Sequence, residues 1–302
     1  MSTLVVGSVA LDTVRTPFGH VEEVLGGSAT YFSTAASFFT DVRLVAVVGE
    51  DFPEHHLVFL RERKIDLRGL QRVPGKTFRW AGEYGFDLNQ ARTLDTQLNV
   101  FANFAPKIPE EYRDSDIVFL GNIDPDLQRE VLRQVQRPAL IAADTMNYWI
   151  ANKAESLRQT LELVDALLIN DAETRQVAGE ANLVQAAQKI LAWGPKSLVI
   201  KRGEYGALMI SREGWFAAPA LPLEEVRDPT GAGDCFAGGF VGYLANTMNF
   251  DDASVRKAMI MGSVMASFNV EAFSLDRLRT LTYGEIEGRY RVFKRLAHFE
   301  DL

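Results

Sequence analysis

The 302-residue sequence contains a single cysteine, Cys235, and only four histidines. One cysteine cannot form an internal disulfide, which fits a reducing compartment, and we therefore expect a cytoplasmic protein. The histidines show none of the spacings typical of zinc ligands, so we predict no zinc site. No stretch approaches the roughly 18 apolar residues of a membrane span. The segment from Met1 to Gly7 lacks the basic residues of a signal peptide and predicts a first strand.

The sequence also lacks clustered positive charge. Its formal net charge is −8, and the sequence contains no long block of consecutive Lys or Arg residues. Proteins that bind nucleic acid usually present a basic face, so the charge argues against this class of partner. A nucleotide polyphosphate would have to be held by local devices against the overall repulsion, such as a helix N-terminus, Mg²⁺ or one or two basic side chains.

With 47% hydrophobic and 24% charged residues, the composition is that of a globular protein, in which short apolar runs alternate with stretches of helical periodicity. The runs predicted as strands are 4–10, 43–48, 117–120, 139–143, 166–169, 197–200 and 207–210. The predicted helices are 28–39, 53–64, 126–136, 153–163, 182–193, 232–247, 251–270 and 282–298. Several strands are apolar on both faces, which favours a buried, mostly parallel sheet. The alternation predicts a three-layer α/β/α sandwich.

Two segments, at about 12–25 and 73–104, interrupt this alternation. The first holds short β-like pieces, and the second holds β-like stretches at 77–84 and 96–104 on either side of a polar turn at 87–90. We predict that both segments contribute strands to a small sheet inserted into the main domain. A plain surface hairpin is the alternative.

The most informative stretch is DPTGAGDCFAGGF at 228–240, where a glycine turn leads directly into a predicted helix. The first N–H groups of a helix have no partner within it, and the helix dipole adds partial positive charge there. Because Gly231 and Gly233 carry no side chains, a phosphate can approach these donors. Asp234 would repel a resting phosphate, so its position indicates a general base that takes a proton from an attacking hydroxyl. The alternative is a capping acid at the start of an ordinary core helix.

The run from Thr230 to Asp234 resembles the C-terminal signature of the ribokinase-like (PfkB) carbohydrate and nucleoside kinases. The resemblance implies a ribokinase-like fold over residues 1–302 as a single kinase domain, with ATP and Mg²⁺ as cofactors. It also implies that the backbone amides of Gly231, Ala232, Gly233 and Asp234 form an anion hole for the transferred phosphoryl group, with Asp234 as the catalytic base.

Two features near the N-terminus agree with this family, and a third departs from it. Gly26 and Gly27 precede a predicted helix and are similar to the diglycine whose backbone faces the substrate. Asp12 follows the first strand, where open α/β sheets bind ligands, and a carboxylate there can accept hydrogen bonds from two adjacent hydroxyls. Relatives often place an asparagine just past the diglycine, whereas this chain has Tyr31 in that region. This tyrosine is either a substrate contact, for a different sugar or a nucleoside, or a core residue.

On the nucleotide side, Asn170 and Glu173 match the family's N-x-x-E motif, which organises Mg²⁺ through water. A helix cap is the alternative or additional role of this pair. The segment from Lys201 to Gly206 resembles the loop that contacts the nucleotide in relatives, with Gly203 and Gly206 at the matching glycines. Lys201 or Arg202 is a candidate for neutralising phosphate oxygens, and solvated charge in a hairpin is the alternative.

Further positions are implied by the resemblance alone. Asp228 and Thr230 match residues that hold a monovalent cation such as K⁺ in some relatives, and Asn269 matches a segment that lines the adenine pocket. Asp144 and Asn147 follow a predicted strand where many relatives have D-x-N, facing the phosphates or the substrate.

These features together predict ATP-dependent phosphorylation of a hydroxyl group on a small sugar. A nucleoside kinase is the alternative, because Trp80, Phe101 or Phe104 of the inserted segment could stack a base. A third hypothesis is a non-catalytic paralogue that binds sugar or protein. In the family the inserted segments form a lid over the substrate and often a dimer clasp, which implies a homodimer through the lid.

Overall fold

The computed structural model describes residues 1–300, and within that range one large sheet of nine strands runs through the molecule. Its strand order is β13-β12-β11-β10-β9-β8-β1-β4-β5, and neighbours from β5 to β11 are parallel whereas β12 and β13 are antiparallel. The strands are β1 (Ser2–Val6), β4 (Asp41–Gly49), β5 (Asp66–Val73), β8 (Ile117–Leu120), β9 (Leu140–Ala143), β10 (Ala166–Asn170), β11 (Ser197–Lys201), β12 (Ala207–Ser211) and β13 (Trp215–Ala218).

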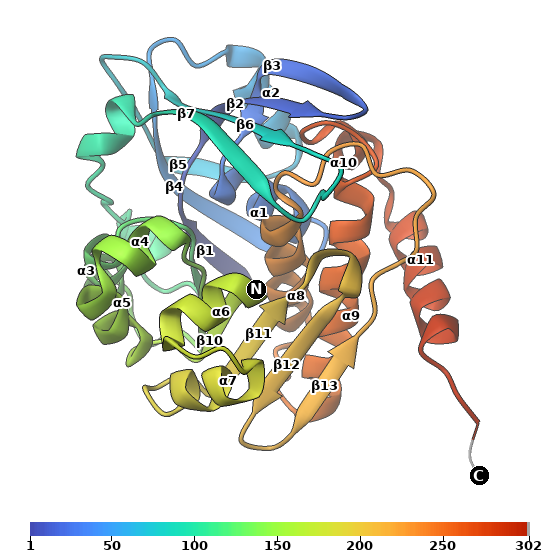
Figure 1. Cartoon of the computed structure of the whole chain (residues 1–302). Helices are drawn as coiled ribbons and strands as arrows, with labels where there is room; N and C mark the ends of the chain where they lie inside the picture. The colour runs from blue at the N-terminus through green and yellow to red at the C-terminus, as the bar shows by residue number, and fades with distance from the viewer. Residues whose placement is uncertain (301–302) are drawn as a thin grey trace.

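Helices cover both faces of this sheet (Figure 1). One face packs against α1 (Ser28–Ala36), α2 (Glu54–Glu62), α8 (Ala232–Thr247), α9 (Asp252–Asn269), α10 (Asp276–Thr280) and α11 (Tyr283–Leu296). The other packs against α3 (Pro125–Gln134), α4 (Asn147–Asn152), α5 (Ala154–Leu161), α6 (Asp171–Ala178) and α7 (Leu183–Leu191). Short 3₁₀ helices lie at η1 (Asn99–Asn103), η2 (Glu110–Tyr112) and η3 (Gly203–Tyr205).

Burial of the sheet on both faces explains the continuous apolar runs of the sequence. In β1, Val5 packs into the core on one face, while Leu4 and Val6 pack into the core on the other, and all three are fully buried. Since successive strand residues point to opposite faces, two separate cores require apolar residues at every position. The three-layer α/β/α sandwich predicted from the sequence is confirmed.

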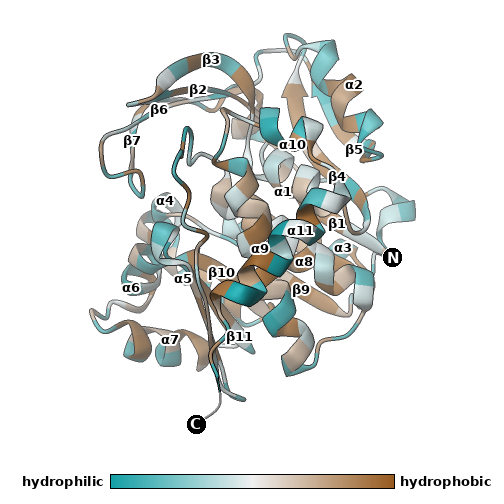
Figure 2. Ribbon diagram, turned by 90° about the vertical axis from the view of Figure 1, so that its right-hand side faces the viewer, coloured by the Kyte–Doolittle hydropathy of each residue, from teal (hydrophilic) through white to brown (hydrophobic). Residues whose placement is uncertain are grey.

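A second, four-stranded sheet lies beyond one end of the large one (Figures 1 and 2). Its order is β3-β2-β6-β7, from β2 (Ala10–Thr16), β3 (Gly19–Gly26), β6 (Phe78–Tyr84) and β7 (Ala91–Gln97). The two inserted segments therefore contribute the small sheet that the sequence predicted. No helix in residues 1–300 is long and apolar enough to span a membrane.

Two predicted boundaries were wrong. The strand expected at 4–10 ends at Val6, and Ala10 already belongs to β2 of the small sheet. The stretch 96–104, expected to be a strand, is mostly the 3₁₀ helix η1, and the strand of this region is β7. The aromatic residues that made 96–104 resemble a strand pack together instead: the Phe101 ring stacks on Phe78 and Phe104, with centroids 5.2 and 5.8 Å away.

Candidate active site

Several polar residues gather at the carboxyl edge of the large sheet. Asp144 follows β9, Asn170 ends β10 and Lys201 ends β11. Because these neighbouring strands are parallel, their carboxyl ends share one edge, which is where open α/β sheets bind ligands. The N-terminus of α8 reaches the same place, since a Cβ built on Gly233 would lie 3.0 Å from the Lys201 ammonium nitrogen.

The start of α8 leaves its backbone donors open. Gly231 is the N-cap residue, in a left-handed conformation (φ 75°), and no side chain caps the helix. The Ala232 amide donates to the carbonyl of Pro229 (3.2 Å). Across the part of the chain that the structure describes, the amides of Gly231, Gly233 and Asp234 donate to no backbone or side-chain acceptor. Three of the four amides predicted to form an anion hole are therefore available, and Ala232 is the exception.

Tyr31 closes this turn from the other side. A Cβ on Gly231 would overlap its ring, so only glycine fits both the positive φ and the close approach. Tyr31 is buried, and among the described residues its hydroxyl has no hydrogen-bond partner. Burial and the nearby carboxylate of Asp12 hold its pKa well above the ordinary value. Tyr31 packs in the core against this turn, as one of the two sequence alternatives has it, and a contact with substrate stays a prediction.

Asp234 lies in the first turn of α8 and is partly accessible rather than sealed in the hydrophobic interior. Removal from water and the negative charge of Asp144 raise its pKa well above the usual range, while Lys201 lowers it. Asp12 and Glu173 add further repulsion. A raised pKa makes this carboxylate a stronger base than an ordinary aspartate, and it stands beside the open amides.

Asp144 and Lys201 form a largely buried ion pair of 3.0 Å. Burial alone would lower the pKa of Lys201, but the surrounding carboxylates of Asp144, Glu173 and Asp234 raise it. The backbone amide of Thr145 donates to the same aspartate (2.7 Å) and fixes its orientation. The sequence singled out Lys201 as a phosphate-neutralising candidate. The ion pair now places Asp144 at the centre of the site as well.

Asn170 and Glu173 form a reciprocal capping box at the start of α6. The Asn170 side chain accepts from the Glu173 amide (2.7 Å), and the Asn170 amide donates to the Glu173 carboxylate (2.8 Å). The capping role that the sequence allowed is therefore present. Burial and Asp144 raise the pKa of Glu173 to about 7, against the opposing effect of Lys201. Within residues 1–300, no group of three or more His, Cys, Asp or Glu side chains is arranged to bind a metal ion directly.

Asp12 projects from β2 of the small sheet and is buried. Burial raises its pKa to about 7, an amide hydrogen bond from Gly27 lowers it, and Asp228 raises it. Gly26 must be glycine because a Cβ there would overlap the Asp12 carboxylate, and Gly27 has a positive φ of 93° as the N-cap of α1. The diglycine and Asp12, predicted separately, therefore form one unit.

The loop before α8 is held by side chains that the sequence assigned to ligands. The Asp228 carboxylate accepts from the backbone amides of Thr230 (2.9 Å) and Ser274 (3.1 Å). The buried Asn269 amide donates to the Thr230 carbonyl (2.8 Å) and accepts from the Cys235 thiol (3.3 Å). Asn269 therefore braces the loop before α8 from inside, and a contact with a purine stays a prediction. A cation at Asp228 and Thr230 stays a prediction.

The small sheet touches this loop through Tyr84. The Thr230 hydroxyl donates to the Tyr84 phenolic oxygen (3.3 Å), and burial raises the pKa of Tyr84 to about 12. Sequence spacing gave no indication of this contact, since the two residues are 146 positions apart. In the loop after β11, Gly206 has a positive φ of 83° and packs its Cα against the backbone of Ala218. Gly203 lies against Asn89 of the small sheet.

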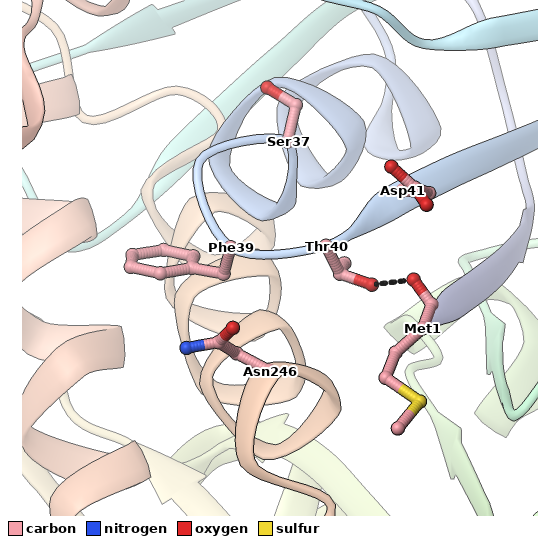
Figure 3. A pocket seen from close by; sticks show the side chains of 6 residues that line it. All are labelled: Met1, Ser37, Phe39, Thr40, Asp41 and Asn246. Atoms are coloured by element: carbon pink, nitrogen blue, oxygen red, sulfur yellow. Dashed lines mark hydrogen bonds between the residues drawn. The ribbon is translucent and has the colours of Figure 1, made fainter.

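A cavity of about 290 Å³ elsewhere in the molecule is unrelated to these residues (Figure 3). Its lining includes Met1, Thr40 and Asp41, which lie at or beside the amino ends of β1 and β4. The Thr40 hydroxyl donates to the Met1 carbonyl there (2.8 Å). The cavity therefore lies at the edge of the sheet opposite Asp144 and Lys201.

Comparison with known proteins agrees with the geometry. The model of the family described as "pfkB family carbohydrate kinase" matches residues 3–278. The chain is 33% identical over 247 residues to a cytidine kinase of Thermococcus kodakarensis, covering 80% of this chain and 87% of that protein. A Burkholderia thailandensis nucleoside kinase in complex with inosine has a TM-score of 0.77 at 22% identity, covering 96% and 98% of the two chains. A putative ribokinase II from E. coli in complex with ATP and Mg²⁺ also gives 0.77, at 18% identity over 98% and 99%. These two structures show the shared fold.

Proposed function

This chain belongs to the pfkB family of carbohydrate kinases, and we propose that it transfers the γ-phosphoryl group of ATP to a hydroxyl group of a nucleoside. The observation that carries this proposal is the start of α8, where three open amides stand beside Asp234. As a phosphotransferase with a hydroxyl acceptor, the enzyme must stabilise charge on the moving phosphoryl group and remove one proton.

In this mechanism the amides of Gly231, Gly233 and Asp234 receive the oxygens of the transferred group, helped by the helix dipole. The Asp234 carboxylate accepts the proton of the attacking hydroxyl, and its raised pKa makes it a stronger base than an ordinary aspartate. Asp12 accepts hydrogen bonds from neighbouring hydroxyls and so orients the acceptor. The transition state of such transfers is loose, so positioning and charge stabilisation supply most of the rate.

Lys201 lies beside the open amides. Its ammonium group pairs with Asp144 and is suited to bind phosphate oxygens of the nucleotide at the same time. Glu173 and Asp144 fit Mg²⁺ that keeps its water ligands, since they form no direct chelate. Burial, together with the negative charge of Asp144, raises the pKa of Glu173, and a cation nearby would relieve that repulsion. Mg²⁺ bound with ATP would neutralise phosphate charge during transfer. Asn170 contributes by holding Glu173 in place.

The choice of a nucleoside over a simple sugar rests on Trp80. Trp80 and Tyr84 lie four residues apart on β6, so their side chains share one face of the strand. Because Tyr84 contacts Thr230, this face is turned toward the large sheet and the start of α8. The Trp80 indole lies over Gly82, where a Cβ would overlap the ring. Its Nε1–H donates to the Thr93 hydroxyl (3.3 Å), which fixes the ring's orientation.

Trp80 is also the register neighbour of Asp12 across the β2–β6 pair. A flat, fixed indole beside the residue that would bind the ribose hydroxyls offers a platform for a planar base, and such stacking contributes roughly 1–3 kcal/mol. The similarity to a cytidine kinase supports the same substrate class. The small sheet then acts as a lid over the nucleoside. Of the other aromatic candidates, Phe101 stacks between Phe78 and Phe104, and the three rings form a separate cluster.

Dimerisation through the lid stays a prediction. Strand β7 is exposed along its whole length at the edge of the small sheet, where a second copy could pair with it. Measurement of the mass in solution by light scattering checks this prediction.

The test is an ADP-release assay with ATP and a panel of cytidine, inosine, adenosine and ribose. We expect turnover with at least one nucleoside, and Asp234→Asn should lower kcat by about 10²–10⁴ while ATP still binds. Trp80→Leu should raise the KM for the nucleoside by about 5- to 100-fold, whereas Trp80→Phe should restore most of the affinity. Trp215→Leu, at an exposed position on β13, is the matched control. Phosphorylation of ribose in preference to every nucleoside would contradict the substrate assignment, and full activity of Asp234→Asn would contradict the base.

A further inference from the structure

The tip of the β6–β7 hairpin, residues 85–90, lies against the loop of residues 202–206 that follows β11. We call these segments the hairpin tip and the nucleotide-side loop. The Asn89 Nδ2 group donates to the Glu204 carboxylate (3.2 Å), and the Glu204 backbone amide donates to the Asn89 Oδ1 atom (3.3 Å). Asn89 therefore both donates to and accepts from one residue that is 115 positions away.

Residues of both the hairpin tip and the nucleotide-side loop favour the contact between Asn89 and Glu204. The Asp87 carboxylate accepts from the backbone amide (3.0 Å) and the side-chain amide (3.2 Å) of Asn89, so the Asn89 side chain is held in one orientation. On the other side, Gly203 has a positive φ of 55°, and a Cβ there would overlap the Asn89 amide. The absence of a side chain at Gly203 therefore leaves room for the Asn89 amide.

The nucleotide-side loop is connected to the proposed phosphoryl site over a very short distance. It begins directly after Lys201, and the hydrogen bond from the Arg202 amide to the Gly206 carbonyl (2.8 Å) keeps it tight. Lys201 itself pairs with Asp144 and lies beside α8. A shift of this loop would therefore also move Lys201.

The hairpin makes a second polar contact with the core, at Tyr84. Its phenolic oxygen accepts from Thr230, in the loop that leads into α8. The hairpin thus touches both sides of the proposed phosphoryl site, one side through Tyr84 and the other through Asn89. Strand β7 buries none of its residues, and segments with so little buried surface open at low free-energy cost. A few polar contacts are then enough to decide how often the hairpin is closed.

We propose that Asn89 and Glu204 form a latch that couples the lid to the nucleotide-side loop, so that nucleotide and nucleoside each increase the other's affinity. The proposal rests on the proposed function, because it takes the small sheet as the lid and the loop as a neighbour of ATP. A nucleotide that orders the loop presents Glu204 to the hairpin tip, and a nucleoside that holds the lid closed presents Asn89 to the loop. By linkage the two effects have the same size.

The latch is tested by two binding measurements and one exchange measurement. Calorimetry gives the Kd of cytidine without and with a saturating non-hydrolysable ATP analogue and Mg²⁺, and the ratio of the two values is the coupling factor. Hydrogen exchange follows the amides of residues 85–90 with and without the analogue. We expect the analogue to slow exchange at the tip and Asn89→Ala to reduce the coupling factor about 3- to 10-fold, the effect of losing one or two hydrogen bonds.

Three matched variants separate the latch from general damage. Gln90→Ala removes a neighbouring polar side chain of the same tip and should behave like the unmodified protein. Glu204→Gln keeps an acceptor oxygen and should retain most of the coupling, whereas Glu204→Ala should lose part of it. A merely structural role of Asn89 would lower thermal stability without changing the coupling factor.

An unchanged coupling factor in Asn89→Ala, or an unprotected tip while the analogue binds, would overturn the latch. Failure of the proposed function looks different: the unmodified protein would phosphorylate no nucleoside, although the analogue would still slow exchange at the tip.

Discussion

Replacing the buried acid of the small sheet should change how stability depends on pH. Burial raises the pKa of Asp12 from 3.8 to about 7. Below pH 3.8 this carboxyl group is protonated in both the folded and the unfolded chain, so its ionisation does not lower the free energy of unfolding. As the pH rises toward 7, the unfolded chain loses the proton first, so the free energy of unfolding falls. Above pH 7 the cost levels off at about 4 kcal/mol.

Asp12→Asn removes this dependence because an amide does not titrate. Relative to the unmodified protein, the variant should gain about 2–3 kcal/mol of stability between pH 5 and pH 8, whatever the constant effect of the substitution itself. Urea unfolding at several pH values measures the difference, with the m-value checked for constancy. Glu22→Gln, at an exposed position on β3 of the same sheet, is the matched control.

A stability difference between Asp12→Asn and the unmodified protein that does not vary with pH would refute the reasoning. A bound nucleoside supplies a further check. Hydroxyl groups that donate to the carboxylate favour its ionised form, so saturating ligand should reduce the pH dependence of the unmodified protein and leave that of Asp12→Asn unchanged.

Three other predictions concern the core of the site. Asp144→Asn removes a like charge from the surroundings of Asp234, lowers the pKa of that base and should move the acid limb of the kcat–pH profile to lower pH; an unmoved limb would show that another group titrates. Gly231→Ala forces a side chain into the Tyr31 ring at a positive φ and should cost at least about 2 kcal/mol in urea unfolding, together with most of the turnover. Asn170→Ala removes the cap of α6 and should lower stability by about 0.5–2 kcal/mol in the same assay, whereas a neutral result would mean that the cap is redundant.

The large sheet was predictable because its strands are buried on both faces and therefore form continuous apolar runs. β5 was missed for the opposite reason: of its eight residues only Gly69 is buried, so no apolar run marks it. β7 buries no residue, so no apolar run marks it, and the aromatic stretch at 96–104 next to it predicts a strand instead. Strands at the edges of sheets carry too little burial to leave a hydrophobic pattern.

Part of the candidate site was also predictable, because Asn170 and Lys201 end neighbouring parallel strands, whose carboxyl ends must meet at one edge of the sheet. The contacts of Asn269 with Thr230 and of Gly203 with Asn89 were not predictable, since a motif match does not show which protein groups a residue touches. Tyr84 and Asn89 were missed entirely as contacts. They act across more than a hundred residues of chain, between two separate sheets, and no local spacing encodes such a pairing.

The sole thiol of the chain stands next to the proposed catalytic base, with its hydrogen directed to Asn269. A labelling reagent can reach it only when the beginning of α8 loosens and the bond to Asn269 breaks. The chain thus carries a natural labelling site beside the proposed phosphoryl site. Because it is the only cysteine in the sequence, all thiol labelling reports on this position. The rate at which Cys235 is alkylated therefore measures how often the start of α8 opens, and no probe has to be introduced.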